Sequence, residues 1–135
     1  TWGVNMHLFD IGVKELSSKP NKKFDIVSST DMLEHCETDD IPAILKEIND
    51  YATEAVLVSI STREAKKTLP DGRNAHLTVK PEKWWMNKIT EVADKPWLIL
   101  FEGDRKPIET DNPERNFIIE SIGFKDKDLK KLVKV

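Results

Sequence analysis

The feature that most constrains this chain is a nearly continuous apolar run, Ala-Val-Leu-Val-Ser-Ile, at residues 55–60. A strand that is exposed on one face alternates polar and apolar residues, whereas a run of this kind is typical of a central parallel strand covered on both faces. Sheets built from such strands occur in α/β proteins, where helices pack against the sheet. We therefore expect an α/β fold with this segment inside its sheet.

Two segments with helical periodicity lie on either side of this run. The first follows Thr38–Asp40, whose side-chain oxygens and negative charge favour a helix start, and Pro42 is tolerated in a first turn. Its apolar positions share one helical face and comprise Ile41, Ile44, Leu45, Ile48 and Ala52. The second helix is expected to begin at Pro81, and its apolar face comprises Trp85, Ile89 and Val92.

The remaining strands are expected where short apolar segments are bounded by turn-forming residues. They comprise residues 4–9, 24–28, 97–101 and 117–122, and the second of them is expected to be buried. Residues 69–72, Leu-Pro-Asp-Gly, form a turn, and residues 103–114 form a polar loop. The order strand, strand, helix, strand, helix, strand, strand predicts one domain over residues 1–135, with a mostly parallel sheet that ends in an antiparallel hairpin.

Composition excludes several classes of protein. Hydrophobic residues make up 39% of the chain and charged residues 33%, which is typical of a globular domain. No apolar run approaches the roughly 20 residues that span a bilayer, and a net charge of -3 gives no general attraction to nucleic acids. The single cysteine, Cys36, excludes an internal disulfide and a Cys-rich zinc site, and it has no base partner that would make it a nucleophile. A cytoplasmic location is expected, and no metal ligands are assigned.

Residues 24–35, Phe-Asp-Ile-Val-Ser-Ser-Thr-Asp-Met-Leu-Glu-His, resemble the fourth-strand motif of class I S-adenosylmethionine-dependent methyltransferases. In that family a Phe-Asp-apolar-apolar strand and a polar turn precede an apolar-Leu-Glu-His segment, and these features fall in register here. Residues 8–11 stand where the family has its third strand, and residues 54–61 stand where its fifth strand belongs. The last two predicted strands resemble its C-terminal hairpin, so the resemblance covers nearly the whole chain.

The sequence lacks one essential part of the family's motif pattern. Class I methyltransferases hold their cofactor with a Gly-rich turn after the first strand and with an acid after the second. No two of the glycines here lie close enough to form such a turn; they are Gly3, Gly12, Gly72, Gly103 and Gly123. The resemblance therefore implies a truncated Rossmann-like sheet, with helices on its faces, that begins just before the third strand. Such a chain is expected to bind S-adenosylmethionine weakly or not at all and to lack activity alone.

The resemblance also implies where the cofactor would contact this chain. In open α/β sheets, ligands bind outside the carboxyl ends of the strands. The cofactor-binding positions implied are Asp10, Ile11, Ser29, Thr30 and Asp31. The Asp10 carboxylate would contact the adenine amino group, and the turn at residues 29–31 would border the methionine part. Alternatively, Asp10 is a turn former bonded to its own backbone, and Asp31 caps the turn before Leu33.

The methyl acceptor is expected near two histidines. His76 follows the turn at residues 69–74 and is the best candidate for a catalytic general base, because imidazole side chains titrate near neutral pH. His35 and Trp84 are the candidate substrate-binding residues. The alternatives are that His76 bonds a neighbour, that His35 is a polar residue at a helix edge, and that Trp84 or Trp85 packs into the core.

These features leave more than one function open. The first hypothesis is methyl transfer to an unknown acceptor, and the alternative is a non-catalytic binding or assembly module with the same sheet. Half of a nicotinamide dehydrogenase is a weaker hypothesis, because it too would need a Gly-rich fingerprint. The family's strand order, 3-2-1-4-5-7-6, would leave a gap between the first two strands of this chain. We expect residues 4–9 to pair directly with residues 24–28, or two chains to form a homodimer.

Overall fold

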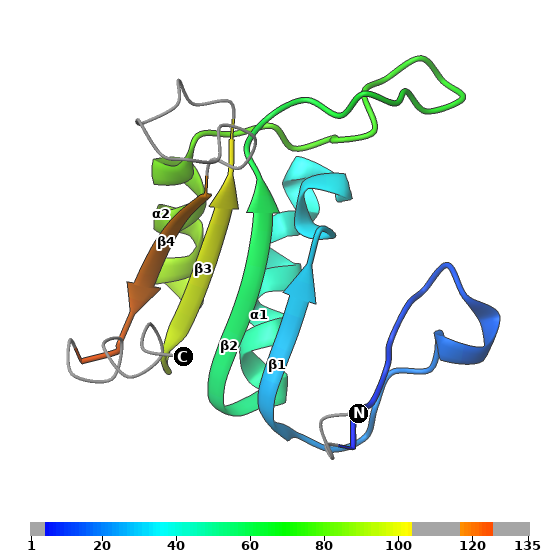
Figure 1. Cartoon of the computed structure of the whole chain (residues 1–135). Helices are drawn as coiled ribbons and strands as arrows, with labels where there is room; N and C mark the ends of the chain where they lie inside the picture. Colours follow the sequence, from blue (N-terminus) through cyan, green and yellow to red (C-terminus); the bar gives the residue numbers. More distant parts are fainter. Residues whose placement is uncertain (1–4, 104–116, 126–135) are drawn as a thin grey trace, which may run out of the picture.

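The sheet of this protein has four strands in the part of the chain that the computed structural model describes, residues 5–103 and 117–125 (Figure 1). The strands are β1 (Phe24–Thr30), β2 (Ala52–Ser61), β3 (Trp97–Glu102) and β4 (Phe117–Ile122), in the spatial order β1-β2-β3-β4. The pairs β1–β2 and β2–β3 are parallel, and β3–β4 is antiparallel. The predicted α/β class and the antiparallel C-terminal pair are therefore confirmed.

Two α-helices connect the parallel strands, and three short 3₁₀ turns stand outside them. The helices are α1 (Ile41–Tyr51), between β1 and β2, and α2 (Glu82–Val92), between β2 and β3. The 3₁₀ turns are η1 (Lys14–Leu16), η2 (Leu33–His35) and η3 (Thr38–Asp40). The predicted α1 cap is only partly right, because Thr38–Asp40 forms its own turn and Asp40 makes no side-chain capping bond. At its other end, α1 passes into β2 at Ala52 without a loop.

Both helices pack on the same face of the sheet, behind the strands in Figure 1, and they contact each other. The strands β1, β2 and β3 are laid down in one direction across the sheet, so crossovers of the same hand bring both helices to one side. The core lies between these layers. From the sheet it includes Val56, Val58, Ile60, Trp97, Ile99 and Phe101, and from the helices Ile41, Leu45, Ile48, Trp85 and Ile89.

The other face of the sheet, which we call the open face, carries apolar side chains without a covering helix among the described residues. Its apolar residues, placed by strand register, are Ile26, Leu57, Leu98, Leu100, Phe117 and Ile119. Ile26 is 57% exposed and Leu57 is 36% exposed. Within the described residues, the helices expected on both faces of the sheet are found on one face only, and the central apolar run is covered on that face only. The predicted buried strand at residues 24–28 is wrong, since β1 is an edge strand of the described sheet.

The strand predicted at residues 4–9 is also wrong for residues 5–9, which have no regular structure. Met6 is 71% exposed and Ile11 is 82% exposed, and the pairing expected between this segment and β1 is absent. An extended segment is not stable as a β-strand unless it pairs with another strand. Instead the backbone bonds locally, with the N–H of Asp10 donating to the carbonyl of Leu16 at 3.0 Å.

The predicted turn at residues 69–72 is confirmed. The N–H of Gly72 donates to the carbonyl of Leu69 at 2.9 Å, and Gly72 adopts a φ of 87°, which glycine tolerates at no steric cost. Within the predicted loop at 103–114, residues 104–114 lie outside the described residues. No helix in the described part of the chain is long and apolar enough to cross a membrane.

We expect Asn49→Ala to lower the free energy of unfolding by about 1–3 kcal/mol, the usual cost of a buried donor left unpaired. Asn49 is 2% exposed and accepts from the Trp97 indole N–H at 3.2 Å while donating to Asp94 at 2.9 Å. Urea unfolding followed by tryptophan fluorescence measures the change. The control is Lys46→Ala on the same helix, which removes a solvent-exposed ion pair with Asp50 and should leave the unfolding midpoint unchanged.

Candidate functional site

Three side chains with metal-ligating or proton-accepting atoms meet at the carboxyl ends of β1 and β2. Asp31 directly follows β1, His35 ends η2, and His76 lies in the long connection between β2 and α2. One ligand atom from each residue lies within 4.8 Å of the others. We call these residues the Asp-His-His cluster. This edge is where open parallel sheets bind their ligands, because the loops that follow the strands converge there.

The backbone at Asp31 turns the chain sharply out of β1. Asp31 has a φ of 52°, in the left-handed region that aspartate tolerates better than most residues. Its N–H donates to the carbonyl of Ser59 at 3.3 Å and to the Ser59 hydroxyl at 3.1 Å, which ties the turn to β2. The turn is thereby held where the following residues, Leu33–His35, can form η2 above the strand ends.

Both imidazole rings are oriented by backbone carbonyls. Nδ1 of His35 lies 2.9 Å from the carbonyl oxygen of Ala75, and Nδ1 of His76 lies 2.6 Å from that of Arg63. A carbonyl oxygen only accepts hydrogen bonds, so each Nδ1 carries the hydrogen and each neutral ring keeps its lone pair on Nε2. The rings meet edge to face, with centroids 4.7 Å apart, and His76 is 9% exposed.

Glu34 is fully buried beneath this cluster. Its Oε1 accepts the N–H of Ser61 at 2.8 Å, and its main-chain carbonyl accepts the N–H of Thr78 at 3.0 Å, while Oε2 has no hydrogen-bond donor among the described residues. Burial raises the pKa of the Glu34 carboxyl, backbone hydrogen bonds lower it, and the adjacent Asp31 carboxyl raises it. A buried acid thus stands directly beside the Asp31 ligand group.

The loop that carries His76 is held by a side-chain clamp. Asn74 accepts the N–H groups of Ala65 and His76, both at 2.9 Å, and donates to the carbonyl of Ala65 at 2.9 Å. Thr78, also buried, donates its hydroxyl hydrogen to the carbonyl of Cys36 at 2.8 Å. These bonds position His76 relative to η2. Sequence reasoning missed Asn74 and Thr78, although an Asn two residues before a His could have indicated the clamp.

The structure brings together only some of the predicted site residues. Asp31, His35 and His76 meet, although they were expected in separate cofactor, substrate and catalytic roles. Asp10 and Ile11 lie in an exposed segment, where the Asp10 carboxylate accepts the N–H of Gly12 at 2.8 Å, as in its turn-former alternative.

The other predicted positions contribute no ligand atom to the cluster. Ser29 and Thr30 occupy the end of β1 on opposite faces of the sheet, with Ser29 on the helix-covered side. Trp84 packs against the core and edge to face on Trp85, with centroids 5.1 Å apart. The side chains of Lys80 and Lys88 also lie over its ring. Trp84 thus packs as its core-packing alternative expected, and its substrate-binding role stays a prediction.

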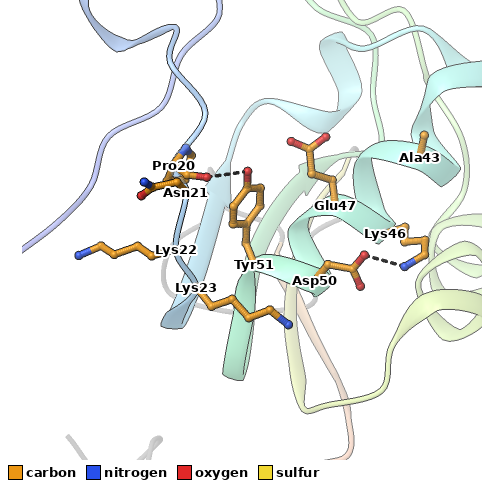
Figure 2. Close-up of a pocket in the computed structure, with 9 residues that line it drawn as sticks. All are labelled: Pro20, Asn21, Lys22, Lys23, Ala43, Lys46, Glu47, Asp50 and Tyr51. Atoms are coloured by element: carbon orange, nitrogen blue, oxygen red, sulfur yellow. Dashed lines mark hydrogen bonds and ion pairs between the residues drawn. The ribbon is translucent and has the colours of Figure 1, made fainter.

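A shallow hollow elsewhere on the surface is a weaker candidate site. Figure 2 shows it between the segment that enters β1 and the outer side of α1; its lining is Pro20, Asn21, Lys22, Lys23, Ala43, Lys46, Glu47, Asp50 and Tyr51. Its polar groups largely satisfy one another, since Tyr51 donates to the carbonyl of Pro20 at 3.0 Å and Lys46 pairs with Asp50. The convergent, preoriented groups of the Asp-His-His cluster favour that site instead.

Comparison of the chain with models of protein families, with curated proteins and with solved structures found no match.

We expect Glu34→Gln to stabilise the fold more at pH 7 than at pH 4. The raised pKa means that the protonated carboxyl suits the folded state, so the wild type loses stability as pH rises through that pKa. Glutamine keeps an oxygen that accepts from Ser61 N–H, and it has no charge to bury. Urea unfolding of both proteins at the two pH values measures the difference. An identical difference at both values would contradict the buried-acid assignment, and Glu37→Gln, on an exposed side chain, is the control.

Proposed function

We propose that this chain provides the acceptor-activating side of an S-adenosylmethionine-dependent methyl transfer. The observation that carries the proposal is the Asp-His-His cluster at the carboxyl ends of β1 and β2, of which Asp31 and His35 stand in the segment that resembles the methyltransferase motif. As part of the same proposal, the sheet corresponds to the C-terminal part of a Rossmann-like methyltransferase sheet, and the β3–β4 pair corresponds to its terminal hairpin.

The chemistry asked of the cluster is removal of a proton from the acceptor. A hydroxyl or amine attacks a methyl group only when it is aligned with the carbon–sulfur bond and can lose its proton. The Nε2 lone pairs of His35 and His76 suit this task, because each Nδ1–H is already directed at a carbonyl that stabilises the ring once it is charged.

The cofactor itself does not fit the described residues well. S-adenosylmethionine would supply the methyl group, but the chain has no Gly-rich turn, and Asp10 uses its carboxylate in its own turn. Only the backbone turn at Ser29, Thr30 and Asp31 lies where a cofactor could border the acceptor. We therefore assign the described residues acceptor binding and proton removal, and we assign them few of the cofactor contacts.

A second candidate function is an assembly module, and the open face is the observation that favours it. Phe117 is 43% exposed and Ile119 is 61% exposed there, beside Ile26 and Leu57. Contiguous apolar surface of this kind marks interaction sites. The homodimer expected from the sequence belongs to this candidate, with the free edge of β1 as a second contact. Sedimentation that shows a dimer for the wild type and a monomer for Ile119→Lys would favour it.

We expect calorimetric titration of the purified chain with S-adenosylmethionine to show no binding in the low micromolar range. Each buried polar atom of the cofactor left without a partner costs about 1–3 kcal/mol, which is about 5- to 150-fold in affinity. Low-micromolar affinity would show that the described residues hold the cofactor after all.

The test of acceptor activation uses methyl-labelled S-adenosylmethionine in the millimolar range, because the chain is expected to bind it weakly and to be almost inactive at lower concentrations, together with a panel of small alcohols, phenols and amines. We expect slow label transfer to at least one acceptor class, and His76→Ala should reduce that transfer by about 10²-fold or more. His7→Ala, which changes a histidine outside the cluster, should leave it unchanged. Transfer that is equal in the wild type and His76→Ala contradicts the proposal, and so does its absence for every acceptor.

A further inference from the structure

We infer that Asp31, His35 and His76 bind one divalent transition-metal ion through a carboxylate oxygen and the two imidazole Nε2 atoms. The binding of the ion stands independently of the proposed methyl transfer. Only the ion's role in activating an acceptor rests on that proposal.

The spacing of the cluster is close to that of a formed metal site. Ligand atoms bound at about 2.1 Å to a shared tetrahedral ion lie about 3.4 Å apart. The candidate atoms of Asp31, His35 and His76 already lie within 4.8 Å of one another, so a small inward movement of side chains suffices. Asp31 and His35 are exposed and can make that movement, whereas His76 is buried and serves as the fixed point.

The hydrogen bonds behind the two rings are those that metal-binding histidines need. A ligating imidazole donates its other N–H to a carbonyl or carboxylate, which fixes both the tautomer and the direction of the lone pair. Here Ala75 and Arg63 supply those carbonyls to His35 and His76, respectively. Two rings that meet edge to face with both Nδ1 atoms already engaged have only Nε2 to offer to a common ligand.

Glu34 supplies an independent observation that points to a cation. Its side chain is fully buried, and Oε2 has no donor among the described residues, although buried carboxyl oxygens are ordinarily satisfied. The ion pairs found within the described residues include neither Glu34 nor Asp31. The Asp31 carboxyl is adjacent to Glu34, so a cation held by Asp31 would stand near the unpaired Oε2.

The donor set selects the class of metal. Two imidazoles and one carboxylate suit Zn²⁺, Fe²⁺ or Co²⁺, whereas Mg²⁺ and Ca²⁺ prefer oxygen ligands alone. Three protein ligands leave coordination positions free, and the exposure of Asp31 and His35 lets a substrate oxygen reach them. With the ion bound, both Nε2 lone pairs are engaged. The ion would then lower the pKa of a bound acceptor hydroxyl in place of a free imidazole base.

Metal binding is tested on the purified chain, after chelation and buffer exchange, by calorimetric titration with Zn²⁺ and by visible absorption with Co²⁺. We expect one ion per chain, with absorption bands of a nitrogen- and oxygen-ligated Co²⁺, and much weaker binding of Mg²⁺. His35→Ala and His76→Ala should each weaken Zn²⁺ binding by about 10²-fold or more, and Glu34→Gln, behind the ligands, by about 10-fold. Thermal unfolding should show that Zn²⁺ raises the midpoint of the wild type and does not raise that of His35→Ala.

Two control variants make the test specific. His7→Ala removes a histidine outside the cluster, and Cys36→Ser removes a thiol whose pKa is raised by burial and by nearby carboxylates. Both should bind Zn²⁺ as the wild type does. The inference is overturned by wild-type affinity no tighter than that of His35→Ala, by loss of binding in either control, or by equal binding of Mg²⁺. His35 is exposed, so His35→Ala remains informative even if His76→Ala fails to fold.

The metal site and the proposed methyl transfer can each be contradicted without contradicting the other. Zn²⁺ binding without methyl transfer to any acceptor supports the metal site and contradicts the proposed function. Methyl transfer that persists in the presence of chelator, by a chain that fails to bind Zn²⁺, supports a free imidazole base and overturns the metal site.

Discussion

The hydrogen bonds of one buried acid join the segments that make up the functional end of this molecule. Glu34 accepts the N–H of Ser61 at the end of β2 with its side chain, and it accepts the N–H of Thr78 with its main-chain carbonyl. These two bonds bring η2, β2 and the loop before α2 to one place. His35 is the next residue after Glu34, and His76 is two residues before Thr78. The same two hydrogen bonds therefore help to position both imidazole rings. Without them, the residues of the cluster belong to separate loops.

The arrangement of the fold depends on the direction in which the parallel strands are added. From β1 to β3 the chain steps across the sheet in one sense, and both helices therefore cover the same face. That face holds the core, including Trp85 and Trp97, while the open face keeps Leu57 and its neighbours partly exposed. The site lies at the end of the sheet and depends on neither face for its ligands. The cluster can therefore form whether or not the open face is covered.

Sequence patterns predicted the regular elements well and their environment poorly. The apolar run at 55–60 and the helical spacing of Leu45 and Trp85 are local properties, so β2, α1 and α2 were found. Whether the second face of β2 is covered depends on how other segments are placed, and the run itself carries no information about that. The strand prediction was wrong at residues 5–9 for a related reason. Apolar residues there suit a strand only where a partner strand lies beside them.

The individual residues of the candidate site were predicted from the sequence, but their proximity to one another was not. Asp31 was singled out from the resemblance and its place after a predicted strand, and His35 and His76 were singled out as histidines near the expected methyl acceptor. Their convergence depends on the left-handed backbone at Asp31 and on the clamp formed by Asn74, neither of which leaves a periodic signal.

The direct passage from α1 into β2 at Ala52 has a consequence for how this protein can change over evolutionary time. Because no loop separates the helix from the strand, no flexible segment can accommodate a residue inserted or deleted there. A shift of one position in a strand moves every side chain to the opposite face. Val56, Val58 and Ile60 would then leave the core, and Leu57 and Ser59 would enter it. Insertions and deletions should therefore accumulate in the long connection after β2, and selection should remove them at this junction.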